Sequence, residues 1–226
     1  MKKRIFSLIL GLCLALLVLF SAVSCTKANK LNDAILSLKE CEKLNISLYT
    51  MTYYHIGSKD EEYMQKQELV VDNGTEKLIS TFSTYGQTIE ANNKEKTARD
   101  IIAAEPIDYA EYEARPEYRG YINALLTAIP SYCLVEARFD GVGKKQTMTV
   151  SLNDDNFTGA YGELDKIFSE KLVALEGEDK PLEYGSCDLK IVTRDGYLSE
   201  IYLEVDAECG FTSATFKLNL VCNSHS

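Results

Sequence analysis

The chain has 226 residues, with 34 acidic side chains against 24 basic ones and a formal net charge of −10. An acidic balance of this size argues against nucleic acid as a partner and against electrostatic docking on anionic lipid. The seven cysteines show no C-x-x-C spacing, which argues against zinc ribbons and thioredoxin-type redox motifs.

The first 25 residues have the pattern of an export signal. A basic start, MKKR, precedes an uncharged apolar run over residues 5–23 and then Ser24-Cys25, as in a secretory signal peptide. Residues 19–25, LFSAVSC, resemble the lipobox of bacterial lipoproteins, with Ala22 where leucine is most usual. The resemblance implies that the Cys25 thiol carries a diacylglyceryl group and that residues 1–24 are removed. A plain transmembrane anchor and a cleaved signal without lipid are the alternatives.

Cleavage before Cys25 would leave 202 of the 226 residues and 21 of the 24 basic side chains, for a net charge of −13. Membrane contact then depends on the acyl chains, because two or more chains are needed for stable anchoring. Residues 25–30 are the expected lipidated N-terminus and tether, and the five residues after Cys25 reach only ~17 Å when fully extended. Residues 31–226 are expected to form a single domain held close to the membrane surface.

Hydrophobic periodicity predicts the elements of the first half. Leu31, Ala34, Ile35, Leu38 and Cys41 recur at helical spacing and predict a helix over 31–43. Period-2 alternation predicts a strand over 44–54, and Asp72-Asn73-Gly74 is a turn signal between strands at 63–71 and 77–90. The polar segment 91–115 is expected to be a loop. Pro116 and Pro130 bound a predicted helix over 117–129.

The second half has the clearer alternation. A hairpin is predicted with strands at 132–139 and 144–152 around 140–143, followed by a helix over 159–175. Three alternating strands follow at 182–193, 197–208 and 211–223, with turns at 194–196 and 208–210. Phe216 and Leu218 belong to the apolar face of the last two strands, so both are expected to be buried.

These elements together predict an α+β fold. About eight long antiparallel strands should twist strongly, and such a sheet curls. We therefore expect an unclosed, half-barrel-like antiparallel sheet with two or three helices packed on its concave face.

This order of elements resembles the lipoprotein-carrier superfamily of LolA, LppX and related lipoproteins. The matching features are the helix over 31–43 directly behind the acyl cysteine, the helix over 117–129, and the hairpin at Asp195-Gly196-Tyr197-Leu198. The resemblance implies an unclosed β-meander with helices lining a hollow that binds acyl chains or other apolar ligands. It does not assign that role to particular residues.

Catalysis is not expected. The only histidines are His55 and His225, and serine and cysteine hydrolases usually need a histidine base. No cofactor and no metal are expected. One metal-like pattern is present, since Asp154, Asn156, Thr158 and Asp165 have the spacing of calcium-loop ligands. The alternative interpretation is a turn and helix cap.

Two functions remain open at this point. The first is a membrane-anchored module that binds a lipid or another apolar small molecule, on the extracytoplasmic face of the cell membrane or outer membrane. Its cavity is expected beside the helix over 117–129, whose stripe mixes aromatic and aliphatic side chains, namely Tyr118, Tyr121, Ile122, Leu125 and Ile129. The second is an assembly lipoprotein that binds an envelope protein and has a filled core.

Overall fold

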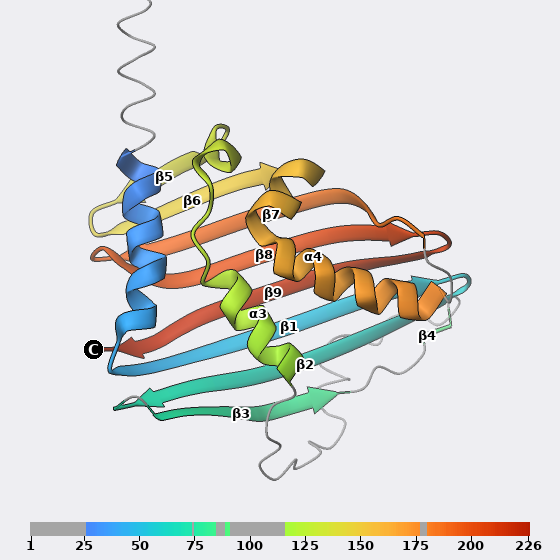
Figure 1. Cartoon of the computed structure of the whole chain (residues 1–226), viewed down its shortest axis with the longest axis horizontal. Coiled ribbons are helices and arrows are strands. Elements are labelled where there is room, and N and C mark those ends of the chain that lie inside the picture. The colour runs from blue at the N-terminus through green and yellow to red at the C-terminus, as the bar shows by residue number, and fades with distance from the viewer. Residues whose placement is uncertain (1–25, 74, 85–88, 91–115, 177–179) are drawn as a thin grey trace, which may run out of the picture.

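The computed structural model describes residues 26–73, 75–84, 89–90, 116–176 and 180–226. These residues form one antiparallel sheet in the order β3-β2-β1-β9-β8-β7-β6-β5, with the short β4 pairing with β2. In this described part β3 and β5 are the two ends of an open sheet. Three α-helices lie across one face of it (Figure 1). We call this face the inner face and the opposite one the outer face. The prediction of an unclosed α+β sheet is thus confirmed.

The first described helix covers residues 26–37 and continues into a 3-10 turn, η1 (Leu38–Glu40). It includes residues 26–30, which were expected to be an extended tether. Ala28 explains the difference, because it is buried and extends the stripe of Leu31 and Ile35 by one turn. At a rise of about 1.5 Å per residue, these five residues advance by about 7 Å.

Two long strands begin the sheet. They are β1 (Lys43–Ile56) and β2 (Lys59–Asp72), which pair along their whole length around a turn at Gly57, where φ is +62°. The predicted turn after Asp72 is confirmed, since β2 pairs with β3 (Thr75–Thr84) from this point onward. A two-residue strand, β4 (Ile89–Glu90), pairs with the start of β2. The predicted loop over 91–115 lies outside the described residues.

The middle of the chain differs most from the prediction. Helix α3 (Pro116–Leu125) begins as expected but ends one turn early. The predicted strand over 132–139 is wrong, because a 3-10 turn, η2 (Ser131–Leu134), occupies its first half. This turn buries Cys133 and Leu134 side by side in sequence, which an alternating strand could not do. Strand β5 (Arg138–Val142) pairs with β6 (Lys145–Leu152) around Gly143, where φ is +63°.

Helix α4 (Asp154–Glu176) is longer than predicted and is interrupted at Tyr161, whose φ of −130° and ψ of 42° are not helical. Its first turn is capped by Asn153, whose side-chain oxygen accepts the Asn156 N–H at 2.8 Å. The helix contacts β6, β7, β8 and β9 and packs against α3. It therefore covers the centre of the inner face (Figure 1).

The last three strands match the prediction closely. They are β7 (Glu183–Arg194), β8 (Tyr197–Cys209) and β9 (Thr212–His225), joined by turns at Gly196 and Gly210 with positive φ. Buried and partly exposed residues alternate along β8 and most of β9. The last residue, Ser226, exchanges two backbone hydrogen bonds with Lys43, which joins the end of the chain to the start of β1.

A stack of aromatic rings fills the space between α4 and the sheet. Phe168 lies 3.9 Å from Phe216 between ring centroids and 6.2 Å from Phe157. Tyr54 meets Phe216 edge-on at 6.0 Å. Each buried phenylalanine side chain contributes about 1.5–3 kcal/mol through its removal from water. Phe216 and Leu218 are both buried, as predicted.

Candidate functional site

The predicted cavity wall beside α3 is a filled part of the core. Tyr121, Ile122, Leu125 and Ile129 are each at most 4% exposed and belong to the central apolar cluster. The Tyr121 ring lies 6.3 Å from Phe168. Tyr118 belongs to α3, but its side chain lies outside the described part of the structure. Four of the five residues predicted to line a cavity are therefore buried in the central apolar cluster.

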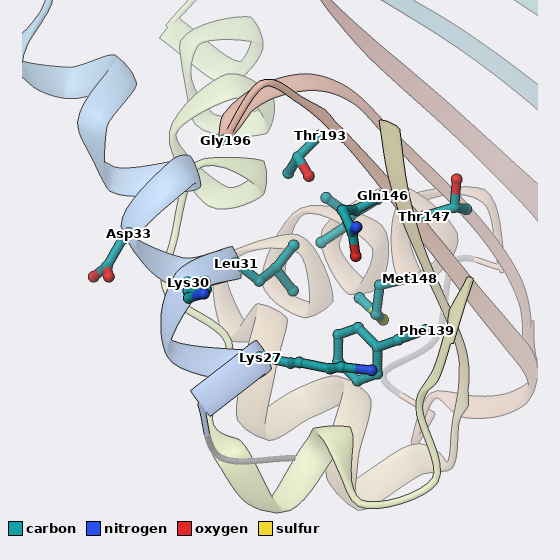
Figure 2. A pocket seen from close by; sticks show the side chains of 11 residues that line it. Lys27, Lys30, Leu31, Asp33, Phe139, Gln146, Thr147, Met148, Thr193 and Gly196 are labelled. Carbon is teal, nitrogen blue, oxygen red and sulfur yellow. The ribbon is translucent and has the colours of Figure 1, made fainter. Parts of the chain in front are cut away.

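A groove of about 590 Å³ lies instead beside the N-terminal helix. One wall is the helix over 26–37, and the other is the inner face of β5, β6 and β7 near the start of β8 (Figure 2). We call it the helix groove. The residues that line it are Lys27, Lys30, Leu31, Asp33, Phe139, Gln146, Thr147, Met148, Ile191, Thr193 and Gly196.

The floor of the helix groove follows from strand register. Phe139 pairs with Met148, and Met148 pairs with Ile191, so the three side chains form one row across β5, β6 and β7. The next row along β6 is polar, with Gln146 opposite Thr193. Leu31 faces these rows from the helix (Figure 2). An apolar floor therefore ends in a polar edge.

The rim of the helix groove is basic. The Lys27 ammonium lies 5.3 Å from the centroid of the Phe139 ring, within the range of a cation–π contact. Lys30 follows one helical turn later, whereas the Asp33 side chain points away from the groove (Figure 2). Among the residues that the structure describes, no carboxylate forms an ion pair with Lys27 or Lys30. Both ammonium groups are thus free to meet an anion.

Asn32 fixes the position of the helix that forms this wall. Its side-chain NH₂ donates to the carbonyl of Ile129 at 2.9 Å, and its side-chain oxygen accepts the Ile129 N–H at 2.9 Å. Ala28, Leu31 and Ile35 pack into the core on the same side. The wall is therefore held by a two-point hydrogen bond as well as by apolar burial.

This arrangement suits an amphiphile. A volume near 590 Å³ lies within the usual range for small-molecule sites. The row Phe139, Met148 and Ile191 offers an apolar surface, and the lysines offer positive charge where the groove opens. A ligand with an aliphatic part and an anionic or carboxylate head matches both features.

The calcium-like pattern does not form a loop. Asp154, Asn156, Thr158 and Asp165 all lie within α4. The Thr158 hydroxyl donates to the carbonyl of Asp154 at 3.0 Å, and Asp165 accepts the Tyr184 hydroxyl at 2.6 Å. The described residues contain no group of three or more metal-ligating side chains placed to hold an ion.

The cysteines after residue 25 are free thiols. Cys133, Cys187 and Cys209 are buried, and burial raises the pKa of Cys187 to about 12. A thiol held in this state is a poor nucleophile at neutral pH. Cys25 itself lies outside the described residues. In the described part of the chain, no helix is both long and apolar enough to span a membrane.

His55 has a carboxylate partner but completes no triad. Its Nδ1 forms a short hydrogen bond with Asp60, and Ser213 stands opposite it on β9. No hydrogen bond joins His55 to Ser213, although both residues are described. Glu208 lies at the end of the same cross-strand row, and its charge would oppose a developing oxyanion.

No protein-family model and no curated protein matches this sequence. Among solved structures, the chain is similar to one titled "Lipid-protein interactions in lipovitellin", with 7% identity and a TM-score of 0.45. This match covers 81% of the present chain and 25% of the lipovitellin chain. A tesB protein of Mycobacterium avium subs paratuberculosis is similar at 9% identity and a TM-score of 0.15, covering 85% of each chain. Both likenesses are too weak to support a conclusion about fold or function.

The sequence predicts a ligand site beside α3, whereas the helix groove lies beside the helix over 26–37. The residues of the helix groove come from three stretches that are far apart in the chain, 27–33, 139–148 and 191–196. Only Leu31 was assigned to a buried stripe beforehand. Ala28, which extends this helix toward residue 26, was the available signal that Lys27 and Lys30 are part of the folded domain and not of a tether.

Proposed function

We propose that this protein is a lipid-anchored module of the bacterial cell envelope that binds an amphiphilic ligand in the helix groove. The single observation that carries the proposal is the composition of that groove. An apolar row of Phe139, Met148 and Ile191 lies below two lysines that have no carboxylate partner in the described structure. Lysines above an apolar surface complement a ligand with an aliphatic tail and an anionic head.

The place of the groove in the chain supports an exchange of ligand with a membrane. Lys27 is two residues from Cys25, the proposed site of acylation. Residues 26–30 are helical, so the two lysines lie in the first two turns of the described helix. We propose that the acyl chains on Cys25 hold this end of the domain against the extracytoplasmic face of the cell membrane or outer membrane. In this proposal the inner face is also the concave face.

The proposed activity is binding without catalysis. The Nδ1 atom of His55 is hydrogen-bonded to Asp60, and His55 has no hydrogen bond to Ser213, which lies opposite it on β9. The buried thiols are poor nucleophiles. Both features support a binding protein more than a hydrolase.

Photo-crosslinking of the full chain in membrane vesicles tests the ligand site. The probe is a palmitic acid that carries a diazirine on its tail, and the labelled peptides are identified by mass spectrometry. We expect labelling within residues 138–152. Gln146→Trp fills the groove from an exposed position and should abolish this labelling, whereas Thr149→Trp, on the outer face of the same strand, should leave it unchanged. Equal labelling of both variants would contradict the proposal.

Metabolic labelling with an alkyne fatty acid tests the anchor separately. Cys25→Ala should remove the label and leave the precursor uncut, because the thiol is the proposed acceptor. Cys41→Ala is the matched control and should remain labelled. Equal labelling of wild type and Cys25→Ala would contradict lipidation at this residue.

A second candidate function follows from the filled centre of the molecule. The stripe of α3 and the aromatic stack beside α4 leave that region packed, and this favours an interaction lipoprotein without a central ligand. Absence of any diazirine labelling in the wild type, with lipidation intact, would favour this candidate.

A further inference from the structure

A second groove, of about 600 Å³, lies on the outer face of the sheet. It spans β2, β1, β9 and β8 near the β1–β2 and β8–β9 turns, so it is separated from the helix groove by the sheet itself. Two cross-strand rows form its surface. One row is Glu62, Tyr53, Thr215 and Asp206, and the other is Asp60, His55, Ser213 and Glu208. Each row therefore has a carboxylate at both ends. We call this site the acidic groove.

Among the described side chains, the four carboxylates of the acidic groove have no lysine or arginine partner. Elsewhere on the outer face acids have basic partners, in the pairs Lys66–Glu68, Lys190–Glu200 and Lys217–Glu204. Across the described chain, no lysine or arginine forms an ion pair with Asp60, Glu62, Asp206 or Glu208. Asp60 bonds His55, and Asp206 accepts hydrogen bonds from Thr215 at 2.6 Å and from Ser186 at 2.7 Å.

Glu62 points to a missing positive partner. The residue lines the groove and is only 6% exposed, and its Oε1 atom has no hydrogen-bond partner in the described structure. Burial and the neighbouring Glu62 carboxylate raise the pKa of Tyr53 to about 12. A buried carboxylate oxygen without a donor is unfavourable unless a ligand supplies one. A donor with positive charge satisfies both the oxygen and the charge.

The spacing of the carboxylates selects the class of ligand. The acids on β2 and those on β8 are three strand spacings apart, or about 14 Å, and the two acids on each strand are about 7 Å apart. We propose that the acidic groove binds a linear aliphatic polyamine, with amino groups at the two acidic ends and its methylene chain between them. Amino groups separated along a flexible chain can reach both acidic ends, and each can donate charge-assisted hydrogen bonds to the carboxylates there. The Tyr53 ring between them already has the Lys217 ammonium 5.8 Å from its centroid.

Other cations fit the groove less well. Calcium and magnesium need several oxygen ligands within about 2.6 Å of one point, whereas these carboxylates lie in two pairs, on β2 and on β8, with two strands between them. A basic protein segment would need a larger interface than a groove of about 600 Å³. The polyamine is therefore the occupant that matches both volume and charge.

Isothermal titration of the full chain in non-ionic detergent with spermidine tests the proposal. The groove variant is Glu62→Gln with Glu208→Gln. The matched control is Glu68→Gln with Glu200→Gln, which removes the same charge from the same face outside the groove. We expect spermidine affinity to fall at least about tenfold in the groove variant and to change less than about twofold in the control. Glu208→Gln alone, at an exposed position, serves if the double variant fails to fold.

Three results would overturn the proposal. Equal loss of affinity in both double variants would show general attraction to an acidic protein. Magnesium binding that displaces spermidine from the wild type would show a metal site. No measurable spermidine binding at low ionic strength, where exposed charges are least screened, would show that the groove takes no polyamine. None of these results bears on the helix groove, whose probe and variants are different.

Discussion

The two grooves of this protein have nearly equal volumes, about 590 and 600 Å³, but opposite chemistry. The helix groove has an apolar floor and a lysine rim, whereas the acidic groove has a pair of carboxylates at each end. Both are built largely from strand residues, the helix groove on the inner face of β5, β6 and β7 and the acidic groove on the outer face of β2, β1, β9 and β8. Because successive side chains of a strand point to opposite faces, a single sheet carries two unrelated surfaces. The size of a groove therefore says less about its ligand than the face on which it lies.

The sharpest test of this two-face comparison is Phe216→Ala against Lys217→Ala. Phe216 is 1% exposed and stacks on Phe168, whereas its neighbour Lys217 faces outward and pairs with Glu204 at 2.8 Å. Removing the ring should cost about 3–5 kcal/mol of unfolding free energy. Removing the lysine should cost at most about 1 kcal/mol. Urea melts measure both, and comparable losses would mean that the assignment of faces is wrong.

A second test asks whether the centre of the inner face is filled. Leu125 is fully buried in the core cluster, so Leu125→Trp should overpack it and cost about 1–3 kcal/mol or more. Thr127→Trp, two residues away and exposed, should have little effect on the urea midpoint. The diazirine label in the helix groove should persist in any folded Leu125→Trp protein, because Leu125 does not line that groove. Tolerance of Leu125→Trp together with loss of label would instead place the ligand beside α3.

Sequence patterns predicted the inner face better than either groove. Alternation holds along most of β8 and β9, so their bounds and buried residues could be predicted closely. The residues Tyr132, Cys133 and Leu134 show no hydrophobic periodicity, so their sequence does not predict the 3-10 turn that they form against α4. The grooves depend on strand register. The hairpin turn at Gly57 places Tyr53 opposite Glu62, and a local turn of this kind can be predicted from sequence. The pairing of β1 with β9 joins segments more than 150 residues apart, so no local sequence pattern predicts its register.

The smallest expected effect concerns the acid stability of the outer face. A hydrogen bond from Lys217 and another from the Tyr202 hydroxyl hold the pKa of Glu204 below its ordinary value. A carboxylate whose pKa is lower in the folded protein stabilises the fold above its unfolded pKa, and this contribution disappears as the pH falls through the folded pKa. Glu204→Gln should therefore lower the unfolding free energy at pH 7 by less than about 1 kcal/mol, since the pair is partly exposed.

Urea melts of wild type and Glu204→Gln at neutral and acidic pH measure this difference, which should vanish once Glu204 is protonated in both states. Thr149→Val, at a neutral outer-face position, is the control and should show the same difference from wild type at both pH values. Glu204 also pairs with Lys217, whose ammonium lies at the edge of the acidic groove, 5.8 Å from the centroid of the Tyr53 ring. Its removal leaves that ammonium free to approach Asp206, so spermidine binding should weaken in Glu204→Gln although no residue of the groove has changed. Unaltered spermidine affinity together with the expected loss of acid-dependent stability would show that the groove and the neighbouring ion pair act independently.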